Sequence, residues 1–441
     1  MTKKKNCREV AMELIYRVIV ENGYSNIVLN SFLNSEESLD SRDRDFVSRL
    51  FYGVLETKLT LDYIISLYSK VKKIQNKVRI ILEMAIYELL YMNANDYAVV
   101  NEYVNLVKIS KNRGAVGFVN AILRSFIRKN KSFELPCEED NNIENLKILY
   151  SCSSWIVESL INDYGPEAAK NFLKGQLNRA NVNIRVNTSK TNCSDLIFKL
   201  NQEGIVVQKS PIENCLVVEQ GNVLRTQAFL DGLFHIQDIS SQICSLIASH
   251  FKPKSVLDVC AAPGGKTFTI AQETGANIVA CDLYSKRVGL IDKNAKRLGL
   301  SKIDCVVFNA EHEHGKIFDL VLCDVPCSGI GVIRRKPEIK YKRAEDVNDL
   351  TKVQRKIIQS ASKSVKSGGY LIYSTCTLRK VENENIVSDF LRDNNNFEIC
   401  PIPEFVNQYF PSSDEYLTMI NGTLECDGFF VSVLRRVGKV D

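Results

Sequence analysis

Hydrophobic residues return every three or four positions along the first part of the chain, from Asn6 to about Lys129. This spacing places apolar side chains on one face of an α-helix. The clearest runs are Val10, Leu14 and Val18; Phe46, Leu50 and Val54; Val78, Leu82, Ala85 and Leu89; and Val119, Ile122 and Phe126. The pattern predicts an all-α domain over residues 1–130.

The periodicity stops in a polar, acidic stretch, residues 131–145, which contains a proline. We interpret this stretch as a linker. Residues 146–179 predict a short helical segment around Trp155, the only tryptophan of the chain. Because Trp155 is followed by Ile156 and Leu160 at helical spacing, it is expected to anchor a core or an interface rather than to stack on a base.

Over residues 180–238 the hydrophobic pattern changes to that of short strands around one helix. This pattern predicts a small α+β domain resembling an RNA-recognition-motif fold. From residue 239 to residue 441, strands alternate with longer helices, the pattern of a doubly wound parallel sheet. The predicted strands are SVLDVC, NIVACD, KIDCVVFN, FDLVLCDVP and GGYLIYSTCT, and GFFVSVLRR may complete the sheet.

Length and composition limit the class of protein. A chain of 441 residues suggests roughly three domains. Hydrophobic residues make up 45% and charged residues 25%, as in soluble globular proteins. No apolar run reaches membrane-spanning length, and the N-terminus lacks the apolar block of a signal peptide. We therefore expect a cytoplasmic protein without a membrane partner.

Charge and cysteine content further limit the binding partners, disulfides and metal sites that can be expected. The net charge of +5 is small, so partner choice must depend on local clusters. The fourteen cysteines are scattered without any CxxC pair, which favours reduced thiols and argues against a structural zinc site. His312 and His314 are a weak metal signal because the other two histidines are remote in sequence. No metal is expected.

The stretch Ser255–Thr267, SVLDVCAAPGGKT, has the form of a buried strand that ends in a glycine-rich turn before a helix. Glycines let backbone amides approach a ligand, and the helix N-terminus adds unpaired donors. Asp282 ends the next strand about twenty residues later, where a carboxylate can accept hydrogen bonds from ribose hydroxyls. Together they predict a nucleoside cofactor, and a chance strand-end aspartate is the alternative.

Two other nucleotide motifs fit less well. A P-loop needs glycine five positions before Gly265, and that position is Cys260, although Lys266 and Thr267 match and Asp324 resembles a Walker B residue. A GxGxxG dinucleotide motif is absent. A P-loop ATPase is therefore the weaker reading.

Two cysteines follow predicted strands: Cys327 in DVPCSG and Cys376 in YSTCT. Because the carboxyl ends of parallel strands open on one crevice, both thiols, Asp324 and the cofactor should converge there. A buried structural cysteine is the default for either one alone. Two cysteines at strand ends make a catalytic role the better interpretation.

The motifs CAAPGGKT, DVPCSG and STCT, with Glu382 and Asn383 downstream and the run Cys426–Phe430, resemble those of S-adenosylmethionine-dependent RNA (cytosine-5) methyltransferases. GYSN at Gly23 and VNAILRSF from Val119 look like a NusB-type helical domain, while RVN at Arg185 and IQDISSQ at Ile236 resemble the segments that precede the catalytic domain. This arrangement is similar to the bacterial Sun/Fmu-type enzymes over essentially the whole chain.

The resemblance implies a NusB-like RNA-binding domain, a small α+β domain and a Rossmann-like methyltransferase domain with a mainly parallel, seven-stranded sheet. It implies methylation of carbon 5 of a specific cytidine in small-subunit (16S) ribosomal RNA by a chain with no evident protein partner, expected to be a monomer. By resemblance, Cys376 attacks carbon 6 of the base, Cys327 assists release of the adduct, Asp324 contacts the cytosine edge and Lys266 supports the developing charge. The order of the two cysteines does not follow from spacing, since Pro326-Cys327 has the form of the nucleophile in DNA cytosine methyltransferases.

The cofactor implied by the resemblance is S-adenosyl-L-methionine. Its expected ligands are the loop of Cys260, Ala261, Ala262, Pro263, Gly264, Gly265 and Lys266, with Asp282, Arg287, Asn309 and Asp324. Asn309 replaces the aspartate usual in the family, so it can accept a hydrogen bond but brings no charge. Ser153 replaces a common proline and is expected to affect only local backbone.

The segment after Cys327 is strongly basic, which predicts a phosphate-binding rim beside the catalytic cleft, with a tyrosine available for stacking. The expected RNA contacts are Arg334, Arg335, Lys336, Tyr341, Lys342 and Arg343. A solvated loop is the alternative for each residue. For the whole chain, a noncatalytic RNA-binding or assembly factor is the second hypothesis, and the presence of both thiols opposes it.

Overall fold

The structure is a computed structural model that describes residues 6–36, 39–71, 73–139, 141–177, 180–410, 415–420 and 424–437. It divides into two compact units. The first consists of Met1–Arg179 with Ile333–Arg343, and the second of Ala180–Val332 with Ala344–Asp441. None of the described helices is both long and apolar enough to cross a membrane.

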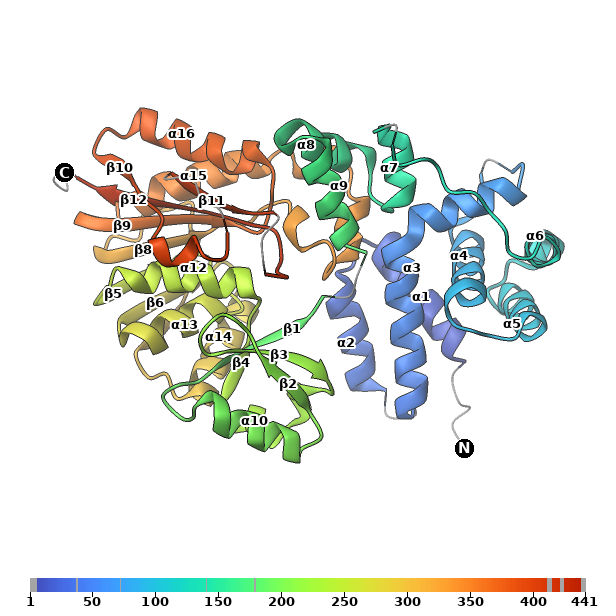
Figure 1. The fold of residues 1–441 in the computed structure, drawn as a ribbon, viewed down its shortest axis with the longest axis horizontal. Helices are drawn as coiled ribbons and strands as arrows, with labels where there is room; N and C mark the ends of the chain where they lie inside the picture. Colours follow the sequence, from blue (N-terminus) through green and yellow to red (C-terminus); the bar gives the residue numbers. More distant parts are fainter. Residues whose placement is uncertain are drawn as a thin grey trace. The chain divides into compact units, whose positions relative to one another are not determined.

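The first unit is helical, as the periodicity predicts (Figure 1). Its described helices are α1 (Cys7–Ile19), α2 (Ser25–Ser35), α3 (Ser41–Tyr68), α4 (Asn76–Tyr91), α5 (Asp96–Ile109), α6 (Val116–Arg128), α7 (Ile143–Leu149), α8 (Ser154–Tyr164) and α9 (Pro166–Gly175). The apolar positions of the predicted runs are buried in one core shared by α1 to α6, except Phe46, which packs against it half-buried. Helix α7 begins at Ile143, inside the stretch that the sequence indicates as a linker.

A segment from the distant C-terminal half of the chain completes this helical unit. Residues Ile333–Arg343 contain a short 3₁₀ helix, Pro337–Tyr341, which packs against α3 and α8. Trp155 Nε1 donates to the Lys342 carbonyl over 2.7 Å, and the Ser153 amide donates to the Lys340 carbonyl over 2.9 Å. Trp155 is thus the anchor that its sequence position indicates. The expectation that Ser153 affects only local backbone is wrong, because its amide and hydroxyl both bind this segment.

The second unit begins with a four-stranded antiparallel sheet in the order β2-β3-β1-β4. Its strands are β1 (Val182–Val186), β2 (Val206–Lys209), β3 (Cys215–Gln220) and β4 (Phe234–Ile236), with α10 (Cys193–Gln202) and the short α11 (Gln227–Leu230). Helix α10 buries Leu196 and Leu200 against Ile184 and Leu216 of the sheet. The small α+β domain is confirmed, and β4 is a strand that the sequence did not indicate.

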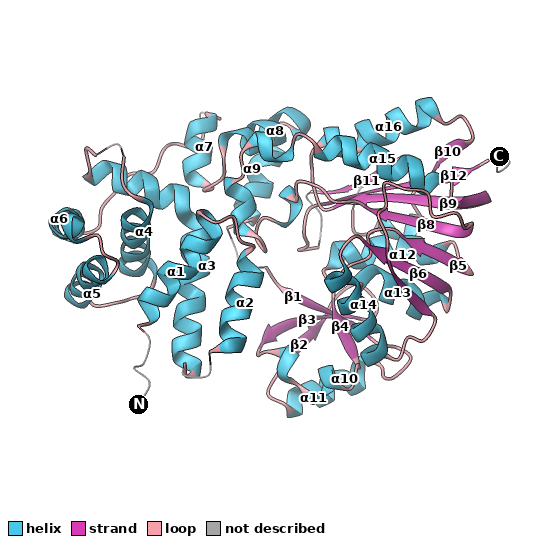
Figure 2. Ribbon diagram, turned by 180° about the vertical axis from the view of Figure 1, so that it is seen from behind, coloured by secondary structure: helices cyan, strands magenta, loops and turns pink. Residues whose placement is uncertain are grey.

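The larger sheet has the order β10-β12-β9-β8-β5-β6-β7, and β11 pairs with the same edge of β12 as β10 (Figure 2). Pairing is parallel from β7 to β9 and antiparallel around β12. The strands are β5 (Ser255–Asp258), β6 (Asn277–Asp282), β7 (Ile303–Val307), β8 (Phe318–Asp324), β9 (Val365–Thr375), β10 (Phe397–Cys400), β11 (Tyr416–Met419) and β12 (Phe429–Arg436). The doubly wound, mainly parallel sheet is confirmed; the described residues form eight strands where seven were expected, and β10 and β11 are strands that the sequence did not indicate.

Alternate residues of this sheet enter two separate cores, as a sheet covered on both faces requires. Val256 packs with α12 and α13 on one face, and Leu257 packs with α15 and α16 on the other. Helix α14 lies over the first face through Ile291 and Ala295. The helices are α12 (Ile239–His250), α13 (Gly265–Thr274), α14 (Ser285–Leu298), α15 (Leu350–Ser362) and α16 (Glu384–Asp393).

Two residues of the RVN motif join the small sheet to the catalytic fold. Arg185 is 1% exposed, and its guanidinium binds Glu273 of α13 at 2.6 Å and Gln242 of α12 at 3.1 Å. Asn187 Nδ2 donates to the carbonyls of Gly232 and Leu298, each over 2.8 Å. A buried guanidinium needs such partners, so the motif holds the two parts of this unit in register.

Candidate active site

The site residues of the second unit gather at the carboxyl ends of parallel strands. Asp258 ends β5, Asp282 ends β6 and Asp324 ends β8, while Cys376 directly follows β9. Strands β8 and β9 are in parallel register, with Asp324 opposite Ser374. This is the edge at which open α/β sheets bind ligands.

The two cysteines that the sequence singles out are in contact. The Sγ atoms of Cys327 and Cys376 lie 3.2 Å apart, within hydrogen-bonding distance for sulfur. The hydrogen bond with Cys376 and burial raise the pKa of Cys327 well above its usual value. Either sulfur can donate in this contact, so one of the two thiols keeps its proton when the other becomes a thiolate.

A buried carboxylate holds the loop that carries Cys327. Glu382 is fully buried and accepts a hydrogen bond from the Ser328 amide and another from Gln354, each over 2.9 Å. Its other oxygen binds Arg379 at 3.0 Å. In the sequence Glu382 belongs to a motif but carries no assigned role. Gln354 was not identified, and its only signal is that it is a polar residue on the buried face of α15.

Cys376 is held from its backbone by two glycines. Its carbonyl accepts from the Gly331 amide over 3.0 Å, and Gly331 in turn accepts from the Gly428 amide over 2.8 Å. A Cβ atom built on Gly331 would lie 1.9 Å from the Gly428 carbonyl oxygen, so only glycine permits this approach. The run Cys426–Phe430 thus contributes a close backbone contact rather than a reactive side chain.

Asp324 lies between a lysine and a serine. Lys266 Nζ is 2.7 Å from Asp324 Oδ2, and the Ser374 hydroxyl donates to Oδ1 over 3.0 Å. The ammonium group also lies 4.9 Å from the centre of the Phe429 ring. Burial disfavours the charge of Lys266, but the carboxylate of Asp324 outweighs it and raises the pKa of this side chain. The pair is a fixed positive and negative charge next to the thiols.

The glycine-rich loop turns sharply between β5 and α13. Gly264 has a φ of 108°, and a Cβ there would lie 2.2 Å from the Phe268 ring. The Ala261 amide donates to the Cys281 carbonyl over 2.7 Å, which ties the loop to β6. Burial raises the pKa of Cys260 well above its usual value, so this thiol is a packing residue. Glycine at position 264 is therefore required by the close packing of Phe268 under the turn.

Asp282 and Arg287 form one side of the predicted cofactor site. Asp282 is 3% exposed, accepts from the Tyr284 amide over 3.2 Å and lies 3.2 Å from the Arg287 guanidinium. Arg287 also donates to the Ala262 carbonyl over 2.9 Å, so it joins the glycine-rich loop to Asp282. The Asn309 side chain accepts from the Glu311 amide over 3.0 Å, and the preceding Phe308 amide donates to the Asp282 carbonyl.

The donor set fits a nucleoside-containing cofactor. A strand-end carboxylate at Asp282 suits a ribose, an amide at Asn309 suits an adenine edge, and a glycine turn suits the remaining polar group. Asp258 adds a buried oxygen, Oδ1, without a hydrogen-bond partner in the structure, while Oδ2 accepts from Thr267 over 2.7 Å. The described residues contain no group of three or more His, Cys, Asp or Glu placed to hold a metal, and His314 packs between Phe308 and Phe318.

The predicted phosphate-binding rim is partly buried in the helical unit. Arg334 is 6% exposed, and the Tyr341 hydroxyl donates to the Leu55 carbonyl and lies 3.1 Å from the Ser151 hydroxyl. The stacking role predicted for Tyr341 does not fit this arrangement, because the side chain completes the packing against α3. The RNA contacts predicted for Arg335, Lys336, Lys342 and Arg343 stay predictions.

Comparison with known proteins matches three families along the chain, and the middle match includes α8 and α9 as well as most of the small sheet. The family described as 16S rRNA methyltransferase RsmB/F matches residues 248–435, the NusB family matches residues 5–128, and an RsmF/B-like ferredoxin-like domain matches residues 152–224. A relative from Bacillus subtilis (strain 168), "Probable ribosomal RNA small subunit methyltransferase B", is 34% identical over 99% of this chain and 100% of its own length. The chain belongs to the ribosomal RNA small subunit methyltransferase B family.

Other members of the methyltransferase B family also match nearly the whole chain. The protein from Shigella sonnei (strain Ss046) is 29% identical over 98% of this chain and 99% of its own length. Among solved structures, "Crystal Structure of PH0851" shares the fold with a TM-score of 0.80, at 23% identity and over 98% of this chain and 100% of that one. Membership assigns the chain an rRNA small-subunit methyltransferase activity and removes the P-loop ATPase reading.

Proposed function

We propose that the protein methylates carbon 5 of a cytidine in small-subunit ribosomal RNA, using S-adenosyl-L-methionine and a covalent cysteine adduct at carbon 6. The observation that carries this proposal is the pair of thiols, 3.2 Å apart, beside the Lys266–Asp324 ion pair. RNA binding alone requires neither thiol. Carbon 5 of cytosine is a weak nucleophile, so a thiol next to fixed charges is the chemistry that the substrate needs.

Cys376 is the proposed nucleophile. Its thiolate forms a bond to carbon 6, and the electrons of the carbon 5–carbon 6 double bond make carbon 5 nucleophilic. Asp324 contacts the cytosine edge and Lys266 supports the charge on the ring, both from fixed positions. S-adenosylmethionine, when bound, supplies the electrophilic methyl group that carbon 5 accepts.

Release completes the cycle. A base takes the proton from carbon 5, the double bond re-forms, and the bond between carbon 6 and Cys376 breaks. Cys327 is proposed to assist this step because its sulfur touches that of Cys376 and because it holds its proton while Cys376 attacks. The Cys376 thiolate then accepts the hydrogen bond from Cys327 again.

The cofactor is proposed to lie along the glycine-rich loop, with its ribose at Asp282 and its adenine edge at Asn309. A solved neighbour supports the fold of this site: "The crystal structure of NSun6 from Pyrococcus horikoshii with SFG" has a TM-score of 0.57 at 23% identity and covers 64% of this chain and 98% of that chain. We also propose that the protein acts in the cytoplasm as a monomer, as expected for an enzyme whose single chain holds all these groups.

The test is methyl transfer from labelled S-adenosylmethionine to small-subunit ribosomal RNA without proteins, followed by nuclease digestion and nucleoside analysis. The expected product is 5-methylcytidine at one position. Label on another base or another atom of cytidine would overturn the proposal. RNA binding without transfer would support the noncatalytic alternative instead.

A further inference from the structure

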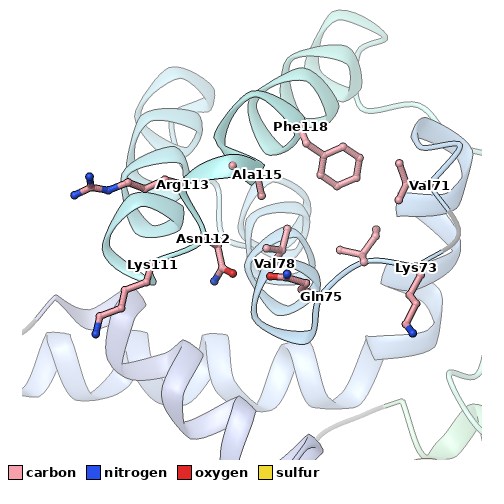
Figure 3. A pocket seen from close by; sticks show the side chains of 11 residues that line it. Val71, Lys73, Gln75, Val78, Lys111, Asn112, Arg113, Ala115 and Phe118 are labelled. Carbon is pink, nitrogen blue, oxygen red and sulfur yellow. The ribbon is translucent and has the colours of Figure 1, made fainter.

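A pocket of about 440 Å³ opens on the helical unit where the turn between α3 and α4 meets the turn between α5 and α6 (Figure 3). Its interior is apolar. Val78 is buried and Phe118 half-buried, whereas Val71 is 51% exposed although it is hydrophobic. An apolar surface that remains open to solvent in such a hollow marks a binding site for a flat, apolar group.

The margin of the pocket is positively charged. Lys73, Lys111 and Arg113 line it and extend outward from the apolar interior (Figure 3). All three side chains are exposed, and none of the lining residues is acidic. Three cations around one hollow, with no carboxylate among the lining residues, favour an anionic ligand.

Two amides supply hydrogen-bonding groups between the apolar interior and the charged margin. Asn112 is oriented by its bonds to the Ser110 carbonyl and hydroxyl, at 3.0 and 3.1 Å. Gln75 precedes α4 and makes no side-chain cap to that helix. Amide groups of this kind can donate to and accept from the edge of a nucleic-acid base.

We propose that this pocket binds one unpaired nucleotide of the substrate RNA, with its base against Phe118 and its neighbouring phosphates at Lys73, Lys111 and Arg113. The combination of an aromatic ring, amides and cations is that of single-stranded RNA sites. An acidic peptide would satisfy the cations but would leave the apolar interior and the amides without matching groups. The inference rests on the proposed function only in naming the RNA substrate.

The experiment compares two triple variants of the full chain that remove the same charge. K73Q/K111Q/R113Q alters the pocket, and R17Q/R42Q/K174Q removes three exposed cations elsewhere on the same unit. Binding of protein-free small-subunit ribosomal RNA is measured by fluorescence anisotropy at several salt concentrations. We expect the pocket variant to raise Kd at least about ten-fold and to reduce the salt slope by about 2, since each single-strand phosphate contact contributes roughly 0.7.

The inference would be overturned if the two variants had equal effects on RNA binding, or if neither had an effect. If the pocket variant kept its RNA binding but lost binding of an acidic peptide, the pocket would be assigned to a protein partner. A second variant, Phe118→Leu, keeps an apolar side chain but removes the ring, and it should lower cross-linking of RNA that carries 5-iodouridine. Because these readouts measure binding, they remain valid if no 5-methylcytidine forms.

Discussion

Cys376 Sγ lies 3.2 Å from Cys327 Sγ, although the two residues are 49 positions apart in the sequence. The contact exists because β8 and β9 are parallel neighbours and end at the same edge of the sheet. Only one sulfur of such a pair can lose its proton readily, since the second charge would lie against the first. In the proposed mechanism one sulfur of the pair is therefore the nucleophile, and the other is a hydrogen-bond donor beside it.

Replacing each cysteine should give opposite results on a denaturing gel. Cys327→Ala leaves the nucleophile but impairs release, so a covalent protein–RNA adduct should accumulate. Cys376→Ala removes the attacking sulfur, so no adduct should form and turnover should fall at least about a hundred-fold. The C327A/C376A double variant should form none either. Adduct formation by Cys376→Ala would reverse the assignment.

Glu382→Gln tests the support of the Cys327 loop. The amide cannot match the charge of Arg379, which lies 3.0 Å from Glu382, and a hydrogen bond to a charged group is worth about 1.5 to 3 kcal/mol. We expect a lower free energy of unfolding in urea and a lower kcat, with KM for the cofactor nearly unchanged because Asp282 and the glycine-rich loop are intact. Glu398→Gln, at an exposed position of the same unit, is the matched control. A changed KM with normal kcat would contradict the positioning role.

Asn309→Asp tests the adenine side of the cofactor site. A charged acceptor makes a hydrogen bond about twice as strong as a neutral one. The Glu311 amide donates a hydrogen bond to the Asn309 side chain over 3.0 Å, and it can still donate to the new carboxylate. Calorimetric titration with S-adenosylmethionine should show Kd lowered by about two- to ten-fold. Weaker binding would mean that Asn309 does not face the cofactor.

Asp258→Asn should change how stability depends on pH. Burial raises the pKa of Asp258 to about 7. The folded protein therefore holds this proton from about pH 4 to pH 7 while the unfolded chain releases it, so this group's contribution to stability falls as pH rises through that window. Asparagine removes the titration. The difference in Tm, variant minus wild type, should increase by about 3 °C or more between pH 4.5 and 7.5 without cofactor. If Tm of the variant and of the wild type changed in parallel with pH, the raised pKa of Asp258 would be contradicted.

Tyr341→Phe removes the hydroxyl that binds Leu55 and contacts Ser151. If this residue completes the helical unit, the variant should lose about 1 to 2 kcal/mol of unfolding free energy, because the Leu55 carbonyl loses the hydrogen bond that the Tyr341 hydroxyl donates. RNA affinity at saturating cofactor should stay the same, since phenylalanine keeps the ring. Stacking on RNA would instead make Tyr341→Ala, but not Tyr341→Phe, weaken binding without further loss of stability.

Much of the second unit could be predicted from sequence because its signals are local. Apolar strands that end in Asp258, Asp282 and Asp324 reveal a parallel sheet, and parallel strands place their ends together. That single rule also placed Cys327 and Cys376 in one site. The three- and four-residue spacing of apolar positions in the first 130 residues likewise reveals the buried faces of α1, α3, α4 and α6.

The features that were missed depend on contacts between distant residues. Lys340 is fully buried and donates to the Glu56 carbonyl over 3.2 Å, yet in sequence it belongs to a run of cations typical of a solvated loop. Nothing near Glu382 indicates that it accepts from the Ser328 amide. Strands β4, β10 and β11 have three or four residues each, too few for a period to be recognised.

The placement of Ile333–Arg343 in the helical unit has a consequence for biosynthesis. A ribosome makes the N-terminal helices first, but the segment that binds Trp155, Ser153 and Leu55 emerges only after the small sheet and most of the parallel strands. The helical unit therefore reaches its final packing late in translation, once β5 to β8 have been made. A fragment that starts at residue 180 would carry Ile339 and Lys340 without the helices that cover them.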